Sequence, residues 1–459
     1  MRIVLLVYII ITIIISVFLR RKENFDSFHG ENLGILMCVA IGTGEWLGGN
    51  STIGVAEYGY EYGFSGSWYT LANAIGIIFL SLFLSEFYRK LNVSTVPEIF
   101  EIVIGEKTAS ISNFILLLIS IIVGASQLIA IASMGEIFNI NYFVTTIVFG
   151  IFITALTIIS GINGIGNMNI VHIFVMYVGV ILSIIYLLIK NGTTELSNLP
   201  REYFVINNIG NSKIISWVVA SVFGACTAQA GIQPILTAKD HKTARKSAVL
   251  IALIIAPFGV ASSFMGILSK VFCGELHNAK LAIPLLINRM NPIIGGILLS
   301  AIIASIISTI TPIMLSFSTL FMKNIYNEKF DKKTSLKISK CLIFIFGVVC
   351  ICLALFMYTK TKILDLVYTA YSIRCSLLVV LVLGIKWGKI SDIGAFCGIF
   401  ISSIVCIFWK LYYYNHGYYP IFAKVNETII TIITALIVTV IFSLMLNKKG
   451  LKNHGDFTN

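Results

Sequence analysis

The sequence predicts an all-α integral membrane protein with about 13 transmembrane helices. Of its 459 residues, 57% are hydrophobic and only 12% are charged, and the mean hydropathy is +0.93. Soluble domains carry about 25% charged residues, so an ordinary soluble protein is excluded. Long uncharged apolar runs recur from end to end of the chain, and a run of about 20 such residues is long enough to cross a bilayer.

Each of these runs predicts one helix. We call the first one the leading helix and number the others 1 to 12. The thirteen predicted helices cover residues 1–18, 33–56, 64–85, 111–138, 142–160, 168–189, 214–237, 248–268, 292–321, 341–357, 363–385, 393–409 and 429–446.

The distribution of basic residues predicts the orientation of the chain. Most of the 33 lysines and arginines fall in loops on the side of the membrane where the chain ends. Positively charged loops stay in the cytoplasm, so we expect a multi-pass protein of the plasma membrane with its N-terminus outside and its C-terminus inside. The same rule explains the net charge of +12 without a nucleic-acid partner. The sequence indicates contact with the lipid bilayer and no obligate protein partner.

Two of the predicted helices contain segments that are poorly suited to continuous helix. Residues 41–54 read IGTGEWLGGNSTIG, and residues 223–234, five spans later, read FGACTAQAGIQP. Non-helical backbone at membrane depth is tolerated where it lines a protein cavity, and matching breaks in two halves are typical of secondary transporters with inverted repeats. The alternative is that these glycines only allow close helix packing.

Several motifs, in their order and spacing, resemble those of the sodium:solute symporter family, which includes proline, sugar and pantothenate symporters. The matching segments lie in predicted helices 1 to 8 and the adjoining loops: STIGVAEYGYEYGFSGSW at 51–68, TVPEIFE at 95–101, Gln229 and Gln233 followed by LTAKDHKTAR at 236–245, and SAIIASIIST at 300–309 followed by NIY at 324–326.

This resemblance implies a fold of the LeuT type, which is built from two inverted repeats of five helices, with helices 1 and 6 discontinuous. The chain would then form one transmembrane transporter domain over residues 1–459. Its parts would be a leading helix (1–19), a ten-helix core (33–385), two additional helices (391–446) and a cytoplasmic tail (447–459).

The resemblance also implies a sodium site between helices 1 and 8. Ser305, Ser308 and Thr309 share one face of helix 8 because they are spaced three and four residues apart. By the family pattern, Ser308 and Thr309 offer hydroxyl groups, and Ser305, Gly44 and Leu47 offer carbonyl groups. Such oxygen ligands suit a hard cation. The alternative is that the hydroxyl groups bond only to their own helix, as is common in membrane helices.

In this fold, the substrate would lie near the membrane midplane, between the two broken helices. The expected lining residues are Trp46, Asn50, Ser51, Gln127, Phe223, Thr227 and Gln229. Glu45 is the only acidic residue deep in helix 1, whereas the family's proline symporters carry an aspartate at the position matching Trp46. Glu45 either supplies the same negative charge from a shifted angle or pairs with a cation elsewhere.

Arg374 stands about halfway through helix 10, where a guanidinium group needs a partner. We consider three hypotheses: a substrate carboxylate, a structural ion pair with Glu45 or Glu136, and snorkelling into a water-filled vestibule. His172 in helix 5 is a candidate proton relay, although a lone membrane histidine is more often a hydrogen-bonding group within the structure.

Together these features predict a sodium-coupled symporter that imports a small polar organic solute, with a carboxylate-bearing solute favoured by Arg374, through alternating access. Sodium would be the coupling ion, and no other cofactor is expected. The sequence contains no P-loop, zinc-ligand spacing or nucleophile elbow, so enzymatic turnover has no support. Two alternatives stay open, a transporter of the same fold driven by protons through Glu45 or His172, and a solute sensor that does not transport.

Overall fold

A computed structural model describes residues 1–18, 32–323, 331–420 and 425–446. Three expected features lie outside these residues: the end of the leading helix at residue 19, the motif at 324–326 and the tail at 447–459. Within the described ranges the chain is helical, and the only β-type pairing is an isolated bridge between Leu33 and Ala238.

The first half of the chain contains the leading helix, the first broken helix and the helices that follow it. These elements are α1 (Arg2–Phe18), α3 (Ile35–Trp46), a π-helix η1 (Asn50–Gly54), α4 (Val55–Tyr62), η2 (Gly63–Ser67), α5 (Trp68–Phe83), α6 (Ser85–Lys90), α7 (Val96–Val103), α8 (Glu106–Ser133), η3 (Met134–Phe138), α9 (Tyr142–Asn191), η4 (Thr194–Asn198) and η5 (Arg201–Phe204).

The second half begins with the second broken helix. Its elements are α10 (Asn211–Ala225), α11 (Gln229–Leu236), α12 (His241–Cys273), η6 (Ala279–Leu281), α13 (Ala282–Asn288), α14 (Pro292–Phe321), α15 (Lys332–Met357), α16 (Ile363–Lys386), α17 (Asp392–His416) and α18 (Glu427–Leu446).

Every predicted apolar run contains helical backbone, but fewer helices meet a criterion of length and composition for a membrane span. Among the described residues, ten helices are long and apolar enough to cross a membrane, or eleven if the bent pair of α10 and α11 counts as one span. The leading helix α1 and the helix α3 are shorter than this test requires. The count of thirteen, the inverted repeat and the division into segments therefore stay predictions.

Two predicted helices, 142–160 and 168–189, join into the single element α9. The backbone leaves helical geometry at Gly161, where φ is 56° and ψ is −178°. This left-handed φ favours glycine, which has no Cβ to clash with the backbone. The chain therefore bends sharply at Gly161 and continues as helix, without the loop that the sequence predicted.

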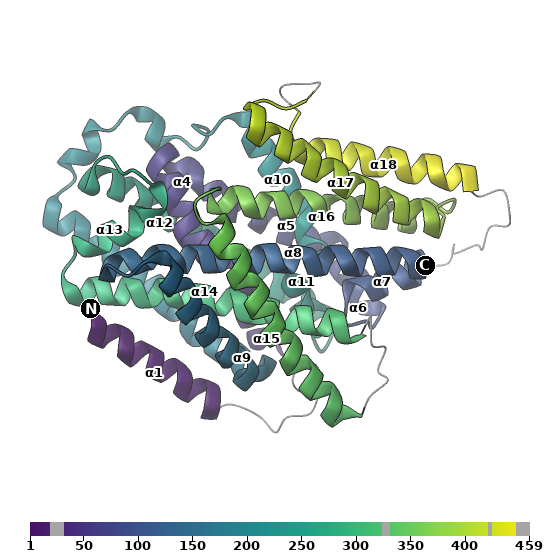
Figure 1. The fold of residues 1–459 in the computed structure, drawn as a ribbon, viewed down its shortest axis with the longest axis horizontal. Helices are drawn as coiled ribbons and strands as arrows, with labels where there is room; N and C mark the ends of the chain where they lie inside the picture. The colour runs from purple at the N-terminus through teal and green to yellow at the C-terminus, as the bar shows by residue number, and fades with distance from the viewer. Residues whose placement is uncertain (19–31, 324–330, 421–424, 447–459) are drawn as a thin grey trace.

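The helices form a bundle with a clear centre and periphery (Figure 1). Helices α14 and α16 are the most buried of the spans, whereas α18 is the least buried. Figure 1 shows α1 at one edge of the bundle and α17 with α18 along the opposite edge. Exposed isoleucine and leucine side chains cover these outer helices, as expected for surfaces that face lipid.

Side-chain caps mark where several helices begin. Asp240 accepts a hydrogen bond from the Thr243 backbone N–H at 2.7 Å, and Asp331 accepts bonds from the N–H groups of Lys333 and Thr334. Such caps satisfy donors that have no partner within the helix. The bond from Thr243 holds the pKa of Asp240 below its ordinary value, because a hydrogen bond to the charged carboxylate favours the ionised form.

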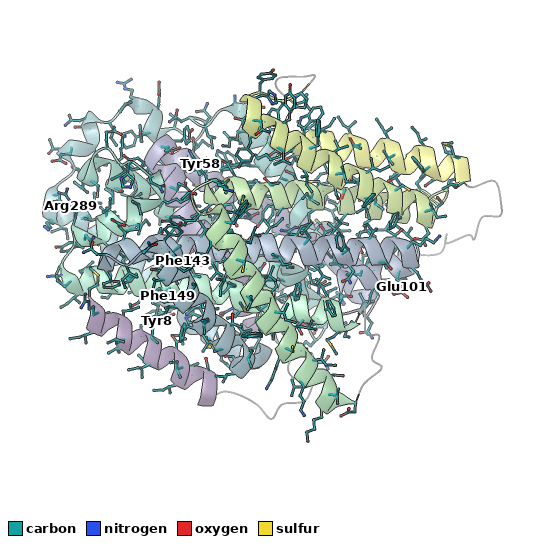
Figure 2. All side chains as sticks on the ribbon, in the orientation of Figure 1. Tyr8, Tyr58, Glu101, Phe143, Phe149 and Arg289 are labelled. Carbon is teal, nitrogen blue, oxygen red and sulfur yellow. The ribbon has the colours of Figure 1, made fainter. Side chains whose placement is uncertain are left out.

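Helix α1 is attached to the bundle through a buried polar contact. Tyr8, labelled in Figure 2, places its hydroxyl 2.7 Å from Nδ1 of His172 on α9. Ser16 of α1 donates a hydrogen bond to the sulfur of Met168 on the same helix α9. His172 therefore serves the docking of the leading helix.

Candidate functional site

The first helix break places exposed backbone against the centre of the bundle. Helix α3 ends at Trp46, and the π-helix η1 begins at Asn50. Between them, Gly48 lies so close to its neighbours that a Cβ there would be 2.5 Å from Thr309 Oγ1 and 2.6 Å from Gln127 Oε1. The Gly49 N–H donates to Gln127 Oε1 at 2.7 Å. Glycine at position 48 is thus required for the close approach of α3, α8 and α14.

The second break lies between α10 and α11, which bend by 44°. Gln229 at the start of α11 accepts a hydrogen bond from the Val96 N–H at 2.8 Å and donates one to the Ser94 carbonyl at 3.1 Å. The Leu33 N–H also donates to the Thr237 carbonyl, and this ties the start of α3 to the end of α11. Both breaks therefore belong to one interconnected region.

The five predicted sodium ligands lie together between the first break and α14. We call this group the oxygen cluster. Thr309 Oγ1 donates to the Gly44 carbonyl at 2.5 Å, and Ser308 Oγ lies 3.4 Å from the Leu47 carbonyl and 2.8 Å from the Ser305 carbonyl. The hydroxyl groups of Ser308 and Thr309 thus reach across to another helix segment, in contrast to the alternative in which they bond only within α14.

The chemistry of the oxygen cluster suits an alkali cation. Its five members contribute carbonyl and hydroxyl oxygens, which hard cations prefer. Ser308 and Thr309 are buried on α14, and Leu47 is buried at the first break. Within the described residues, no group of three or more His, Cys, Asp or Glu side chains is placed to hold a metal ion. The arrangement is therefore unlike a transition-metal centre and is compatible with sodium.

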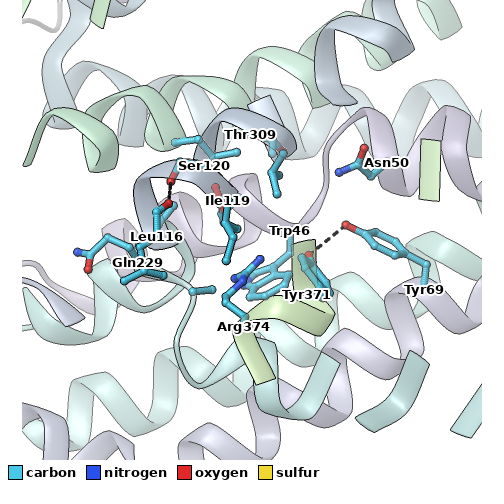
Figure 3. A pocket seen from close by; sticks show the side chains of 15 residues that line it. Trp46, Asn50, Tyr69, Leu116, Ile119, Ser120, Gln229, Thr309, Tyr371 and Arg374 are labelled. Atoms are coloured by element: carbon cyan, nitrogen blue, oxygen red, sulfur yellow. Dashed lines mark hydrogen bonds between the residues drawn. The ribbon is translucent and has the colours of Figure 1, made fainter. Parts of the chain in front are cut away.

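A pocket adjoins the oxygen cluster, and Thr309 belongs to both (Figure 3). Figure 3 shows Trp46, Tyr371 and Arg374 gathered on one side of it, and Leu116, Ile119 and Ser120 of α8 on another. The lining residues come from α3, η1, α5, α8, the second break, α11, α14 and α16. They are Glu45, Trp46, Asn50, Tyr69, Leu116, Ile119, Ser120, Val123, Ala228, Gln229, Ala230, Thr309, Ile313, Tyr371 and Arg374.

Five of the nine predicted substrate residues line this pocket, namely Glu45, Trp46, Asn50, Gln229 and Arg374. The other four do not, and hydrogen bonds account for three of them. Ser51 Oγ donates to the Gly48 carbonyl, Gln127 holds the Gly49 N–H, and Thr227 Oγ1 lies 3.4 Å from the Phe223 carbonyl. The fourth, Phe223, is half-buried away from the pocket.

Sequence reasoning missed the tyrosines and the aliphatic wall of the pocket. Tyr371 stands three residues before Arg374 on α16, and this spacing places both on one helix face. This spacing is visible in the sequence and could have indicated Tyr371 as a lining residue. Leu116, Ile119 and Val123 of α8 repeat at the spacing of an ordinary packed face, so nothing in their pattern separates a pocket wall from core packing.

Arg374 and Glu45 face the pocket without pairing with each other. The Arg374 side chain is 5% exposed, donates from Nη1 to the Gly224 carbonyl at 3.3 Å, and lies 4.5 Å from the centroid of the Tyr371 ring. Its Nε atom and Oε2 of Glu45 are buried without hydrogen-bond partners.

This arrangement corrects two of the three hypotheses for Arg374. No ion pair joins Arg374 to Glu45 or Glu136 in the described part of the chain, and Glu136 is exposed. The burial of Arg374 also contradicts snorkelling into an open vestibule. A ligand carboxylate at Arg374 stays a prediction.

Aromatic and polar contacts extend from the pocket toward the first residues of α16. The hydroxyl groups of Tyr69 and Tyr371 lie 3.4 Å apart, and Trp217 stacks on Tyr368 with ring centroids 4.4 Å apart. Further out, Tyr58 donates to Asp365 at 2.8 Å. Lys362 and Glu61 add an ion pair between the ends of α4 and α16.

Comparisons with known proteins agree with this architecture. A symporter of uncharacterised substrate from Bacillus subtilis, YwcA, is 24% identical over 86% of this chain and 83% of its own length. The human high affinity choline transporter 1 is 21% identical over 72% of this chain and 61% of its own length.

Solved structures share the fold. A substrate-bound, outward-open Na⁺-coupled sialic acid symporter superposes with a TM-score of 0.80 at 17% identity, covering 97% of both chains. Mhp1, a nucleobase-cation-symport-1 family transporter, reaches a TM-score of 0.61 at 14% identity, covering 91% of this chain and 93% of its own. The fold is therefore that of a LeuT-type transporter.

The model of the sodium:solute symporter family matches residues 29–402, which is most of the chain and includes both breaks, the oxygen cluster and the pocket. Members of this family move solutes across membranes, and the described helices supply the required apolar spans. The chain is thus a multi-pass membrane protein that transports a solute, rather than an enzyme, and it belongs to the sodium:solute symporter family.

Proposed function

We propose that this protein is a sodium-coupled symporter that imports a small polar organic solute by alternating access. It would lie in the plasma membrane with its N-terminus outside and its C-terminus in the cytoplasm, and sodium would be its coupling ion, with no other cofactor. The observation that carries the proposal is the oxygen cluster, in which Thr309 of α14 meets the Gly44 carbonyl at 2.5 Å.

Coupling follows from the position of this cluster. A sodium ion held by Gly44, Leu47 and Thr309 would join the first break to α14, and so favour conformations in which these segments are close. Trp46 and Thr309 also line the pocket, so the ion and the solute would act on the same two segments. Two ligands that stabilise one arrangement raise each other's affinity by the same factor.

The test measures the thermal stability of the purified full-length protein while sodium replaces potassium at constant ionic strength. A ligand that binds only the folded state stabilises it by about 2.7 kcal/mol at one hundred times its dissociation constant. We expect a saturable, sodium-specific rise in the wild-type protein and its loss in Thr309→Ala.

Thr311→Ala is the matched control. Thr311 is a buried threonine of the same helix, but its hydroxyl donates to the Ile307 carbonyl within α14 at 2.7 Å. Both variants lose one buried hydroxyl, and only Thr309→Ala removes an atom from the oxygen cluster. No sodium response in the wild-type protein, or the same response in both variants, would refute sodium binding at this site.

Proton coupling is distinguished by uptake in proteoliposomes. His172 lies outside the pocket and contacts Tyr8, which leaves Glu45 as the carboxylate placed to carry a proton beside the solute. Uptake that needs a sodium gradient and continues without a pH gradient is the expected result. Uptake that persists without sodium and stops when the pH gradient collapses would favour the proton-driven alternative.

A further inference from the structure

The pocket contains one acidic and one basic side chain that form no salt bridge with each other, and each has a buried atom without a hydrogen-bond partner. Oε2 of Glu45 and Nε of Arg374 are buried and have no hydrogen-bond partner. A buried ion without a partner costs several kcal/mol. At another buried position, between α17 and α18, Lys410 and Glu427 pair at 2.8 Å. The lack of pairing at Glu45 and Arg374 therefore needs a reason.

The surroundings of Arg374 prepare it for a carboxylate. One edge of the guanidinium is held by the Gly224 carbonyl at 3.3 Å, and its face lies against the Tyr371 ring at 4.5 Å. These contacts fix the plane of the group while Nε stays unpartnered. A planar guanidinium with an unpartnered Nε–H can donate to a carboxylate oxygen.

The surroundings of Glu45 suit a cationic nitrogen. Glu45 lies in the last turn of α3, which ends at Trp46, and the C-terminal end of a helix carries a partial negative charge. The Trp46 and Tyr371 rings meet edge to face with their centroids 6.4 Å apart. A carboxylate beside aromatic rings is a favourable environment for an ammonium group.

We propose that the substrate is a small zwitterion, an α-amino acid or a close analogue, whose carboxylate binds Arg374 and whose ammonium group binds Glu45. This inference rests on the proposed transport function and specifies its substrate class. A carboxylate alone would leave Glu45 unpaired, and a cation alone would leave Arg374 unpaired. A zwitterion gives each of the two side chains a partner of opposite charge.

The other lining residues indicate which substrate side chains are favoured. Leu116, Ile119, Val123 and Ile313 line the pocket, and they offer aliphatic surface without further charge. An aliphatic amino acid therefore fits better than an acidic or basic one.

The test screens the twenty standard amino acids, β-alanine and trimethylglycine for their effect on the thermal stability of the full-length protein in sodium. For the best ligand, two analogues on the same carbon skeleton follow, one without the amino group and one without the carboxylate. We expect each analogue to bind on the order of 10- to 100-fold more weakly, because each loses one charged hydrogen-bonding partner.

Variants assign each charge to its partner. Glu45→Gln should weaken the amino acid by a similar factor and reverse the preference toward the analogue without the amino group. Arg374→Gln should weaken the amino acid and remove its preference over the analogue without the carboxylate. Lys280→Gln is the control, because Lys280 is also a buried cation but bonds to the Tyr358 carbonyl outside the pocket.

The sodium response separates this proposal from the proposed function. If sodium stabilises the protein and no amino acid or analogue does, the zwitterion proposal is wrong and sodium binding stands. If sodium has no effect on the wild-type protein, the proposed function itself fails. Unchanged amino-acid affinity in folded Glu45→Gln and Arg374→Gln would also overturn the zwitterion proposal. If either variant does not fold, the analogue series on the wild-type protein decides.

Discussion

Replacing Gly48 by alanine tests whether the first break and α14 form one ion site. A Cβ at this position would lie 2.5 Å from Thr309 Oγ1 and 2.8 Å from Thr309 Cβ. Ordinary contact begins near 3.4 Å, so the Thr309 hydroxyl must retreat by about 0.9 Å. The same Cβ would displace Gln127 Oε1, which holds the Gly49 N–H at 2.7 Å.

The retreat has two consequences of known size. Overpacking of this kind costs about 1–3 kcal/mol of folding stability. It also lengthens the 2.5 Å contact between Thr309 and the Gly44 carbonyl to as much as about 3.4 Å, which weakens this contact. If Thr309 is a sodium ligand, the loss of a contact to a charged group costs about 1.5–3 kcal/mol of binding, which is roughly 10- to 100-fold in the sodium midpoint.

The assay is the sodium titration of thermal stability, with Gly34→Ala as the control. Gly34 precedes α3 with φ of −76°, and a Cβ there meets nothing within 4 Å. Both variants reduce the freedom of the unfolded chain equally, so their difference reports the clash. If Gly48→Ala and Gly34→Ala share the wild-type sodium midpoint, then the close approach of the two segments does not form the ion site.

Three further predictions concern other parts of the fold. Lys410→Met or Glu427→Leu alone should destabilise the protein by about 3–5 kcal/mol, because each leaves a buried charge unpaired, and the double variant should recover most of this loss in chemical denaturation. His172→Gln should weaken the docking of α1 and increase proteolysis near the N-terminus, while the pH profile of uptake stays unchanged, since His172 lies outside the pocket. The wild-type protein should be more stable than Asp240→Ala, and this difference in stability should be fully present at neutral pH. It should shrink as the pH falls through the lowered pKa of Asp240, because protonation removes the charged cap of α12. A difference that does not change with pH in thermal melts would contradict this prediction.

The sequence predicted the positions of the helices well because the apolar runs are long. It predicted their ends less well. Helix α12 begins at His241, seven residues before the predicted start, because basic residues extend the helix beyond the apolar run. Asp240 caps this extension, and a capping residue is a local signal that a count of apolar residues does not detect.

For the site, too, the sequence predicted local arrangement along one helix better than the arrangement of several helices. The spacing of Ser305, Ser308 and Thr309 fixes which side chains share a face of one helix, and the structure brings them to the first break as expected. The pocket depends on how several helices are rotated against one another. Spacing along one helix does not determine this rotation, and so Ser51 and Gln127 were expected in the pocket but serve the backbone of the break.

Two residues would link the proposed ion site to the proposed solute site. Thr309 belongs to the oxygen cluster and lines the pocket. The ring of Tyr371 lies against the Arg374 guanidinium, and its hydroxyl lies 3.4 Å from that of Tyr69. If the solute binds Arg374 and sodium binds Thr309, each ligand contacts the wall of the same pocket. Coupling between them would then require no long chain of intermediate residues.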